Sequence, residues 1–329
     1  MKYQYLMELA LSFQKSRIFL TAYELGIFTV IGKKGKSSSQ VADELSSAKR
    51  HTDRLLNALC ALGLLKKTGE RFSNTSLSLK YLVNSSPDFL KGIAHNVKMW
   101  DSWSALTQTI RHGRPAMDVI MNARGEEWLN PFIAAMHERA TKSAPAIVKS
   151  LDLSGVSRVL DVGGGSGAYA MAFVRQKKEI AATVFDLPNV VAITRRYIEK
   201  EGLTNKVEVI AGDYNIDSLG CDYDLVFISA IAHMNSFKEN EALAHKAARA
   251  LRGNGQIVIQ DFFMDKDRMN PPGGSFFALN MLLATKSGDT YKESEARIWL
   301  KDAGFTNVKR RDTKFGTALI IGSKTTRRR

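Results

Sequence analysis

The sequence predicts an α/β protein in which a mainly helical first part precedes a sheet that is parallel except for a hairpin at its end. Strand and helix patterns alternate after Leu153, as is typical of a parallel sheet with right-handed crossovers. Two short strand patterns around a glycine turn follow two helical patterns near the start, and a second such pair closes the sequence. The chain has 329 residues, 44% hydrophobic and 24% charged, which suits a folded protein of two domains.

Residues 1–95 predict a winged helix-turn-helix domain. Apolar side chains recur at helical spacing over 4–32. Ser38 or Ser39 is expected to cap a short helix, and leucines predict a further helix over 50–65. Two strand patterns then form the wing, at 66–68 and 71–74. Such a module either reads DNA or serves dimerisation and covers a substrate pocket.

Residues 96–150 predict a helical connector that is interrupted at Gly113-Arg114-Pro115. The connector lacks the Gly/Ser-rich or Pro-rich tract of a flexible linker, so it should pack against another part of the protein. Its spaced aromatic residues suit the wall of a pocket, although such residues are more often core.

Residues 151–329 predict the sheet domain. Strands are expected at 158–162, 182–185, 207–210, 223–228 and 256–260. Helices are expected at 168–175, 190–201, 239–251 and 294–303. The final hairpin, 307–312 and 317–322, requires one antiparallel strand in an otherwise parallel sheet.

Composition excludes several classes of protein. No run of about 18 apolar residues occurs, and charged residues interrupt the first 20, so we expect a cytoplasmic protein with no membrane partner. Cys60 and Cys221 lie far apart in apolar surroundings, which predicts buried thiols and neither a disulfide nor a metal site. The net charge of +14 fits a nucleic acid partner, an acidic small molecule or a soluble surface.

The segment Val159–Ala168 combines a buried strand, a glycine loop and the start of a helix. Glycines let the backbone turn tightly and approach a ligand, and the free N–H groups at the helix start favour an anionic group. Asp186 follows the next strand, where a carboxylate can accept hydrogen bonds from both hydroxyls of a ribose. The two loops together predict a ligand that contains adenosine.

The glycine pattern alone fits a dinucleotide as well as S-adenosylmethionine, because Gly163-x-Gly165-x-x-Ala168 matches the dinucleotide fingerprint. Asp161 before the loop, the GxGxG spacing and the terminal hairpin favour S-adenosylmethionine. Asp213 and Tyr214 in a third loop could hold the edge and face of the adenine.

These residues resemble the S-adenosylmethionine-dependent O-methyltransferases of the plant-type and hydroxyindole small-molecule family. The resemblance covers nearly the whole chain. It rests on Leu25-Gly26-Ile27-Phe28, Trp103-x-x-Leu106, Gly113-x-Pro115, Phe132-x-x-x-Met136, Asp161–Gly167, Phe185-Asp186-Leu187-Pro188, Gly212-Asp213, Leu279-Asn280-Met281-Leu282 and Ala303-Gly304-Phe305.

The resemblance implies a Rossmann-like class I methyltransferase domain, a winged-helix domain that forms a homodimer, and S-adenosyl-L-methionine as the cofactor. It implies His233 as the general base that removes the proton of an aromatic hydroxyl, a task that suits an imidazole near neutral pH. It implies that eight residues bind the cofactor: Asp161, Gly163, Gly165, Asp186, Leu187, Asp213, Tyr214 and Ser229. Seven could wall the acceptor pocket: Trp100, Trp103, Phe132, Met136, Phe276, Asn280 and Met281.

The chain departs from this family near the histidine. The family commonly has Asp-Trp after it, whereas this chain has Met234-Asn235, so an aromatic ring that packs on adenine is missing. The glutamates that flank the histidine in plant enzymes fall on Thr290 and on Ile321 or Gly322. Asp289 and Asp261 are the nearest carboxylates that could orient the imidazole instead.

Two other functions stay open at this point. A weakened acid/base apparatus would suit methylation of carbon or nitrogen, for example on a tetrapyrrole. A DNA-binding regulator could sense an adenosine ligand, but its third helix offers few polar side chains for base edges, so we expect no nucleic acid partner.

Overall fold

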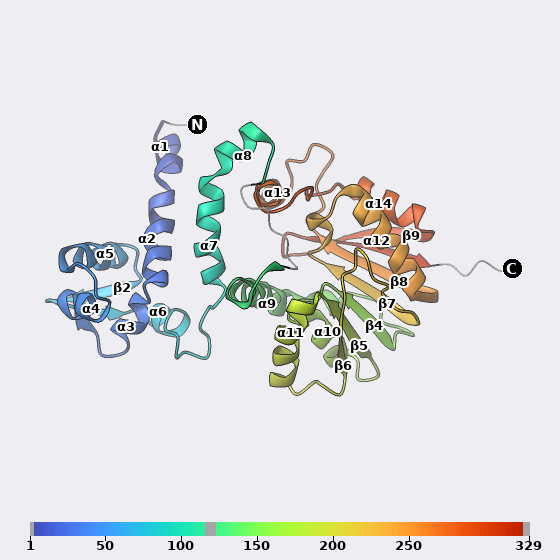
Figure 1. The fold of residues 1–329 in the computed structure, drawn as a ribbon, viewed down its shortest axis with the longest axis horizontal. Coiled ribbons are helices and arrows are strands. Elements are labelled where there is room, and N and C mark those ends of the chain that lie inside the picture. The colour runs from blue at the N-terminus through green and yellow to red at the C-terminus, as the bar shows by residue number, and fades with distance from the viewer. Residues whose placement is uncertain (1–2, 116–122, 325–329) are drawn as a thin grey trace. The chain divides into compact units, whose positions relative to one another are not determined.

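A computed structural model describes residues 3–115 and 123–324 (Figure 1). The chain forms two compact units, Met1–Trp100 and Asp101–Arg329, which divide within helix α7, Ile93–Ser104. The predicted boundaries at 95 and 150 stay predictions. The basic tail, Arg327–Arg329, and part of the predicted connector, 116–122, lie outside the described residues.

The first unit is a helical domain with a small antiparallel sheet. Its helices are α1 Tyr3–Leu11, α2 Phe13–Glu24, α3 Ile27–Ile31, α4 Ser38–Glu44, α5 Lys49–Ala61 and α6 Ser76–Tyr81. Its strands are β1 Lys36–Ser37, β2 Leu65–Thr68 and β3 Arg71–Asn74, in the order β1-β3-β2. The β2–β3 hairpin after α4 and α5 is the predicted wing.

Local chemistry sets the elements of this unit. The cap of α4 is Ser37 rather than Ser38 or Ser39, because Ser37 has an extended backbone and forms a capping box with Gln40. Helix α5 ends at Ala61, four residues before the predicted end, because Gly63 has a positive φ and Leu65 already pairs in β2. A buried cluster joins the elements: Ala22, Ile27, Phe28, Ile31, Val41, Leu56, Leu59, Leu65, Phe72, Leu82 and Val83.

The second unit is built on one sheet. Its strands are β4 Arg158–Val162, β5 Ala181–Asp186, β6 Val207–Ala211, β7 Tyr223–Ser229, β8 Leu251–Asp261, β9 Phe305–Asp312 and β10 Ala318–Lys324. Its helices are α8 Leu106–His112, α9 Glu126–Lys149, α10 Ala168–Gln176, α11 Pro188–Lys200, α12 Phe237–Ala250, α13 Pro272–Ala284 and α14 Glu293–Asp302.

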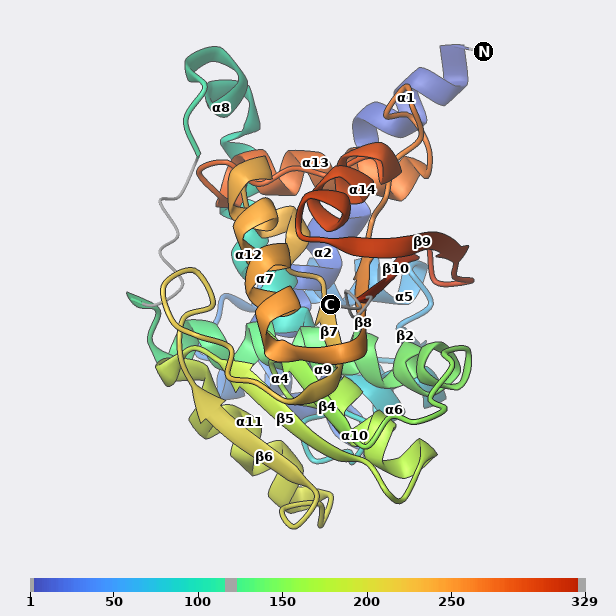
Figure 2. The same ribbon diagram turned by 90° about the vertical axis from the view of Figure 1, so that its right-hand side faces the viewer.

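The strand order is β6-β5-β4-β7-β8-β10-β9, and β10 runs antiparallel to both of its neighbours. This confirms the predicted parallel sheet with one antiparallel strand. The strands β9 and β10 begin and end within two residues of the predicted hairpin, and β9 lies beside α14 (Figure 2).

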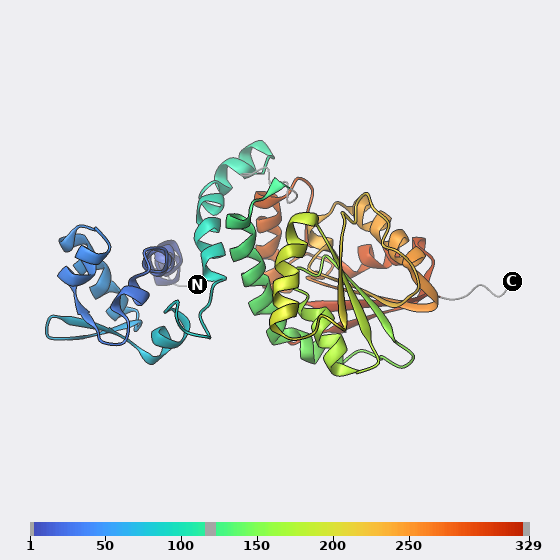
Figure 3. The same ribbon diagram turned by 60° about the horizontal axis from the view of Figure 1, so that its bottom comes forward.

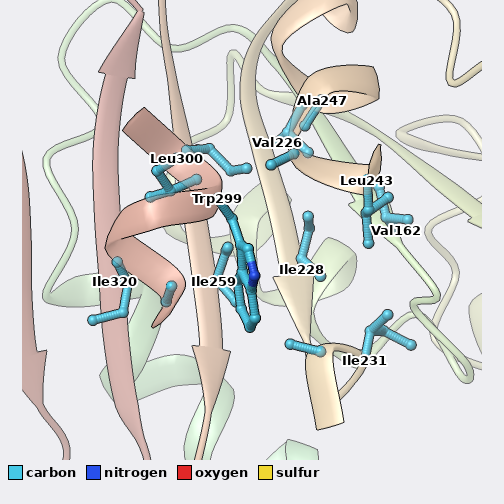
Figure 4. Close-up of a cluster of buried hydrophobic side chains, with 14 of the residues drawn as sticks. Val162, Val226, Ile228, Ile231, Leu243, Ala247, Ile259, Trp299, Leu300 and Ile320 are labelled. Carbon is cyan, nitrogen blue, oxygen red and sulfur yellow. The ribbon is translucent and has the colours of Figure 1, made fainter. Parts of the chain in front are cut away.

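Helices cover both faces of this sheet (Figure 3). On one face, α12 and α14 pack Leu243, Ala247, Trp299 and Leu300 against β4, β7, β8 and β10 (Figure 4). On the other face, α9 and α10 pack Ile147, Met171 and Phe173 against the same central strands. Because both faces are buried, the central strands are continuous apolar runs that end in polar loops.

One sequence prediction is wrong here. Cys221 is exposed beside Asp222 and is not a buried thiol, whereas Cys60 is half-buried. No helix in residues 3–115 and 123–324 is long and apolar enough to cross a membrane.

Candidate active site

The ends of the parallel strands β6, β5, β4, β7 and β8 lie along one edge of the sheet. The segments at these strand ends are therefore neighbours. They are the glycine loop after β4, Asp186 at the end of β5, the loop after β6, Ser229 at the end of β7 and Asp261 at the end of β8. Ligands of open α/β sheets bind at this edge. The structure thus brings together the loops that the sequence predicted to bind one ligand.

The glycine loop needs its glycines for two reasons. Gly163, Gly165 and Gly167 all have φ between +57° and +74°, a conformation that other residues rarely adopt. A Cβ on Gly163 would also lie 2.3 Å from Cδ1 of Ile231. The loop therefore presents bare backbone before α10, as required for the close approach of a ligand.

Asp161, the last polar residue before this loop, is buried. Its Oδ2 accepts a hydrogen bond of 3.1 Å from the Ala170 N–H, whereas its Oδ1 has no partner among the described residues. Burial raises the pKa of Asp161 to about 7. The hydrogen bond from Ala170 acts to lower this pKa, and the negative charge of Asp186 acts to raise it further. A buried oxygen without a partner at this place can form a hydrogen bond with a ligand.

Asp186 links the first two loops. Its Oδ2 accepts from the Gly165 N–H at 2.7 Å, and its Oδ1 accepts from the Leu187 N–H at 2.8 Å. Burial raises the pKa of Asp186 to about 6, although these two hydrogen bonds lower it. Each carboxylate oxygen retains a second lone pair, so the group can still accept from a diol.

The third loop and β7 supply the remaining predicted cofactor residues. Asp213 Oδ1 accepts from the Asn215 N–H at 2.9 Å, and the Tyr214 hydroxyl donates to Asn235 Oδ1 at 3.0 Å. The Ser229 hydroxyl bonds to Gln260 Oε1 at 3.1 Å. Burial is the main cause that raises the pKa of Tyr214, so its hydroxyl stays protonated.

His233 lies in a 3-10 turn, Ala232–Met234, just after β7. Its Nδ1 lies 2.8 Å from Asp261 Oδ1, and its backbone N–H donates to Asp261 Oδ2 at 3.1 Å. A carboxylate only accepts, so Nδ1 carries the proton and Nε2 is left with a lone pair. Nε2 has no hydrogen-bond partner in the described part of the chain.

The structure decides between the two carboxylates that the sequence offered. Asp289 forms an ion pair with Arg268 at 2.8 Å, whereas Asp261 bonds to the imidazole. Asp261 reaches the imidazole because the end of β8, which carries it, lies beside the end of β7, which precedes the turn.

An aromatic side chain contacts the imidazole, and a second ring packs on the first. The Phe277 ring of α13 contacts His233 edge to face, with centroids 4.7 Å apart, and Phe262 lies 4.8 Å from Phe277. One turn further along α13, Asn280 Oδ1 accepts from the Trp103 indole N–H at 2.7 Å. Asn280 therefore lies on the helix that contacts His233, and Trp103 reaches this helix from α7.

The other predicted pocket residues are dispersed. Met281 is buried and Phe276 is 66% exposed, so Phe277, which the sequence did not single out from its neighbour, is the residue that contacts His233. Phe132 stacks on Trp128 beside Leu187, and Met136 is half-buried one turn along α9. Trp100 belongs to the first unit, where it lies under the Arg17 guanidinium.

The arrangement fits S-adenosylmethionine. An adenosine with a charged tail requires hydrogen-bond donors, acceptors and a flat surface. The site offers the bare glycine loop, the unpartnered Asp161 oxygen, the Asp186 carboxylate and the Tyr214 ring. In residues 3–115 and 123–324, no three His, Cys, Asp or Glu side chains gather as a metal site would require.

Comparison with known proteins agrees with this geometry. Residues 103–306 match the family model of an O-methyltransferase domain, and residues 7–84 match that of an O-methyltransferase dimerisation domain. The chain is 32% identical to a 3-hydroxy-5-methyl-1-naphthoate 3-O-methyltransferase of Streptomyces sahachiroi, over 92% of this chain and 90% of that protein.

Two solved structures have the same fold. An O-methyltransferase family protein from Burkholderia thailandensis has a TM-score of 0.89 and 25% identity, with 99% of each chain covered. Human N-acetylserotonin methyltransferase in complex with SAM has a TM-score of 0.85 and 24% identity, with 98% of each chain covered. The chain therefore belongs to the S-adenosylmethionine-dependent O-methyltransferases, with a dimerisation domain followed by a catalytic domain.

Proposed function

We propose that this enzyme methylates a hydroxyl group on a fused aromatic ring, with His233 as the general base and Asp261 as the group that orients it. The observation that carries the proposal is the 2.8 Å contact between Asp261 Oδ1 and His233 Nδ1, which leaves Nε2 as a proton acceptor. Phe277, which contacts the imidazole, and Phe262, which packs on Phe277, suit a flat apolar acceptor. The naphthoate specificity of the Streptomyces sahachiroi relative supports this acceptor class.

The proposed roles of the residues follow from their contacts. Asp161, Gly163, Gly165, Asp186, Leu187, Asp213, Tyr214 and Ser229 would hold S-adenosylmethionine. When bound, S-adenosylmethionine supplies a methyl group from its sulfonium sulfur to the hydroxyl oxygen, and sulfur keeps the electron pair of the broken bond. His233 Nε2 takes the hydroxyl proton, and the Asp261 carboxylate stabilises the resulting imidazolium.

The test compares the wild type with His233→Ala. The acceptors are 3-hydroxy-1-naphthoate and 2-naphthol, which differ only in the carboxylate. We expect methyl ether formation by the wild type and a fall in kcat of about 10²–10⁴-fold in the variant, with unchanged affinity for S-adenosylmethionine by calorimetry. A fall of less than threefold would remove His233 from the proton transfer. Methylation at carbon by the wild type would overturn the choice of oxygen.

The two acceptors also address the positive charge of the chain. A preference for the naphthoate over 2-naphthol would show that the enzyme recognises the carboxylate, whereas equal kcat/KM values would assign the charge of +14 to the surface alone.

We also propose that the enzyme is a homodimer formed through its first unit. The apolar side chains Tyr3, Leu6, Leu9, Leu11 and Phe13 of α1 and α2 are exposed, and α1 has no buried residue. Such a stripe of apolar residues suits a protein interface. Sedimentation should give twice the mass of 36.5 kDa, and Leu6→Lys with Leu9→Lys should give the monomer. A monomeric wild type would contradict this proposal.

A further inference from the structure

A chain of three hydrogen bonds, part-buried at Tyr214 and buried beyond it, joins the third cofactor loop to the turn that carries His233. The Tyr214 hydroxyl bonds to Asn235 Oδ1 at 3.0 Å, Asn235 Nδ2 donates to Asn240 Oδ1 at 3.1 Å, and Asn240 Nδ2 donates to the Ala232 carbonyl at 2.8 Å. The Asn235 and Asn240 side chains come from the catalytic turn and from α12, and both residues are only 4% exposed.

The direction of every bond in this chain is fixed. The Ala232 carbonyl can only accept, so the amide nitrogen of Asn240 faces it and Oδ1 faces Asn235. Asn235 must then donate to Asn240 with Nδ2 and turn Oδ1 to Tyr214. The Tyr214 hydroxyl is therefore the donor at the start of the chain. A buried network with one allowed direction has one arrangement, which makes it rigid.

The chain ends on the peptide group that precedes the imidazole. The carbonyl of this peptide belongs to Ala232 and accepts from Asn240, while its N–H belongs to His233 and donates to Asp261. Asp261 also holds the imidazole itself. The peptide plane is thus held from two sides, by the carboxylate that orients the ring and by the chain that starts at Tyr214.

We propose that Asn235 is a positioning residue that couples the occupancy of the cofactor loop to the orientation of His233. A shift of the Tyr214 hydroxyl reaches the Ala232–His233 peptide through two side-chain amides and no mobile group. The inference rests on the proposed function, since it needs Tyr214 at the cofactor and His233 at the acceptor.

The first test needs no methyl transfer. Hydrogen exchange of the peptide that spans 231–236 is measured by mass spectrometry, without ligand and with saturating S-adenosylhomocysteine. In the wild type we expect the ligand to slow exchange of this turn by about 10-fold or more, because binding removes local openings. In Tyr214→Phe, which keeps the ring and loses only the hydroxyl, we expect the ligand to bind but this protection to be lost. Equal protection in both proteins would overturn the proposal.

The second test is kinetic. We expect Asn235→Ala to lower kcat about 10-fold at saturating S-adenosylmethionine, since small misplacements of a reacting group are costly. Tyr214→Phe should add nothing further in the double variant, because both changes break the same chain. Asn74→Ala is the matched control: Asn74 is a buried asparagine of the first unit that donates to the Phe28 and Gly32 carbonyls. It should lower Tm and leave kcat unchanged.

The outcomes separate this inference from the proposed function. A lower Tm with unchanged kcat in Asn235→Ala would make the residue merely structural. Unchanged kcat in His233→Ala would instead show that His233 is not the general base. The exchange measurement would still decide whether the turn responds to the cofactor loop.

Discussion

Gly288 lies against the backbone of His233: a Cβ built on this glycine would be 2.4 Å from the His233 carbonyl oxygen and 2.6 Å from Thr285 Oγ1. The loop between α13 and α14 therefore packs directly on the turn that carries His233. The Tyr291 hydroxyl, three residues further along, donates to the Asn235 carbonyl at 2.6 Å. The turn is thus held by this loop as well as by Asp261.

Gly288→Ala should displace this turn. We expect a fall in kcat of about 10-fold or more, because the contact is with backbone that cannot rotate away, together with a lower Tm. Gly273→Ala is the control, since its Cβ would meet nothing within 4 Å. Gly273 lies in the first turn of α13, and its change to alanine should raise the free energy of unfolding by about 0.4–1 kcal/mol. Equal kcat in both variants would show that the turn tolerates movement.

Asp261→Asn should impair proton transfer. An asparagine can present its amide nitrogen to His233 Nδ1, which favours the tautomer with the proton on Nε2, and it removes the charge that stabilises the imidazolium. We expect kcat to fall by about 10²–10⁴-fold, as for the carboxylate of a catalytic triad. Asp289→Asn, which breaks only the ion pair with Arg268, should change kcat by less than threefold. A larger fall in kcat for Asp289→Asn than for Asp261→Asn would identify Asp289 as the residue that orients His233.

Asp186→Asn should weaken binding of S-adenosylmethionine. The loss of a charged acceptor costs about 1.5–3 kcal/mol, so calorimetry should show Kd raised by about 10- to 100-fold. Asp152→Asn changes an exposed carboxylate that accepts from the Ser154 N–H, and it should leave Kd unchanged. Unaltered affinity in Asp186→Asn would exclude this residue from the ribose.

The stability of the ligand-free enzyme should fall as pH rises from about 4 to 7. Asp161 has a pKa of about 7 in the folded state against 3.8 as the ordinary value, so the folded chain holds a proton in this range that the unfolded chain lacks. Asp161→Asn should flatten the decline of Tm with pH.

Asp224→Asn is the control, because the pKa of Asp224 is shifted in the opposite direction to that of Asp161. Burial acts to raise the pKa of Asp224, but hydrogen bonds from Ser157, Arg158 and Arg252 outweigh it and lower the pKa. Removal of this carboxylate should make stability less dependent on pH below about 4 and should not affect the decline above it. An identical pH profile in the wild type and Asp161→Asn would contradict the raised pKa.

The sequence was sufficient to predict the sheet and the edge at which the loops gather. Parallel strands end at the same edge, so Asp186 and the glycine loop had to be neighbours once their strands were recognised. The choice between Asp261 and Asp289 depended on the packing of the end of β8 beside the turn after β7, which is set by contacts between segments that are distant in the sequence. Helical spacing alone does not say whether Phe276 or Phe277 of α13 contacts His233, and the bond between Tyr214 and Asn235 depends on how two loops pack together.

Strand β10 lies between β8 and β9 and buries Leu319 and Ile320 completely. A growing polypeptide therefore cannot close the catalytic sheet until synthesis has passed residue 324, although every loop for the cofactor has emerged long before. Chains released before residue 318 would expose the apolar edge of β8 and be substrates for chaperones and proteases.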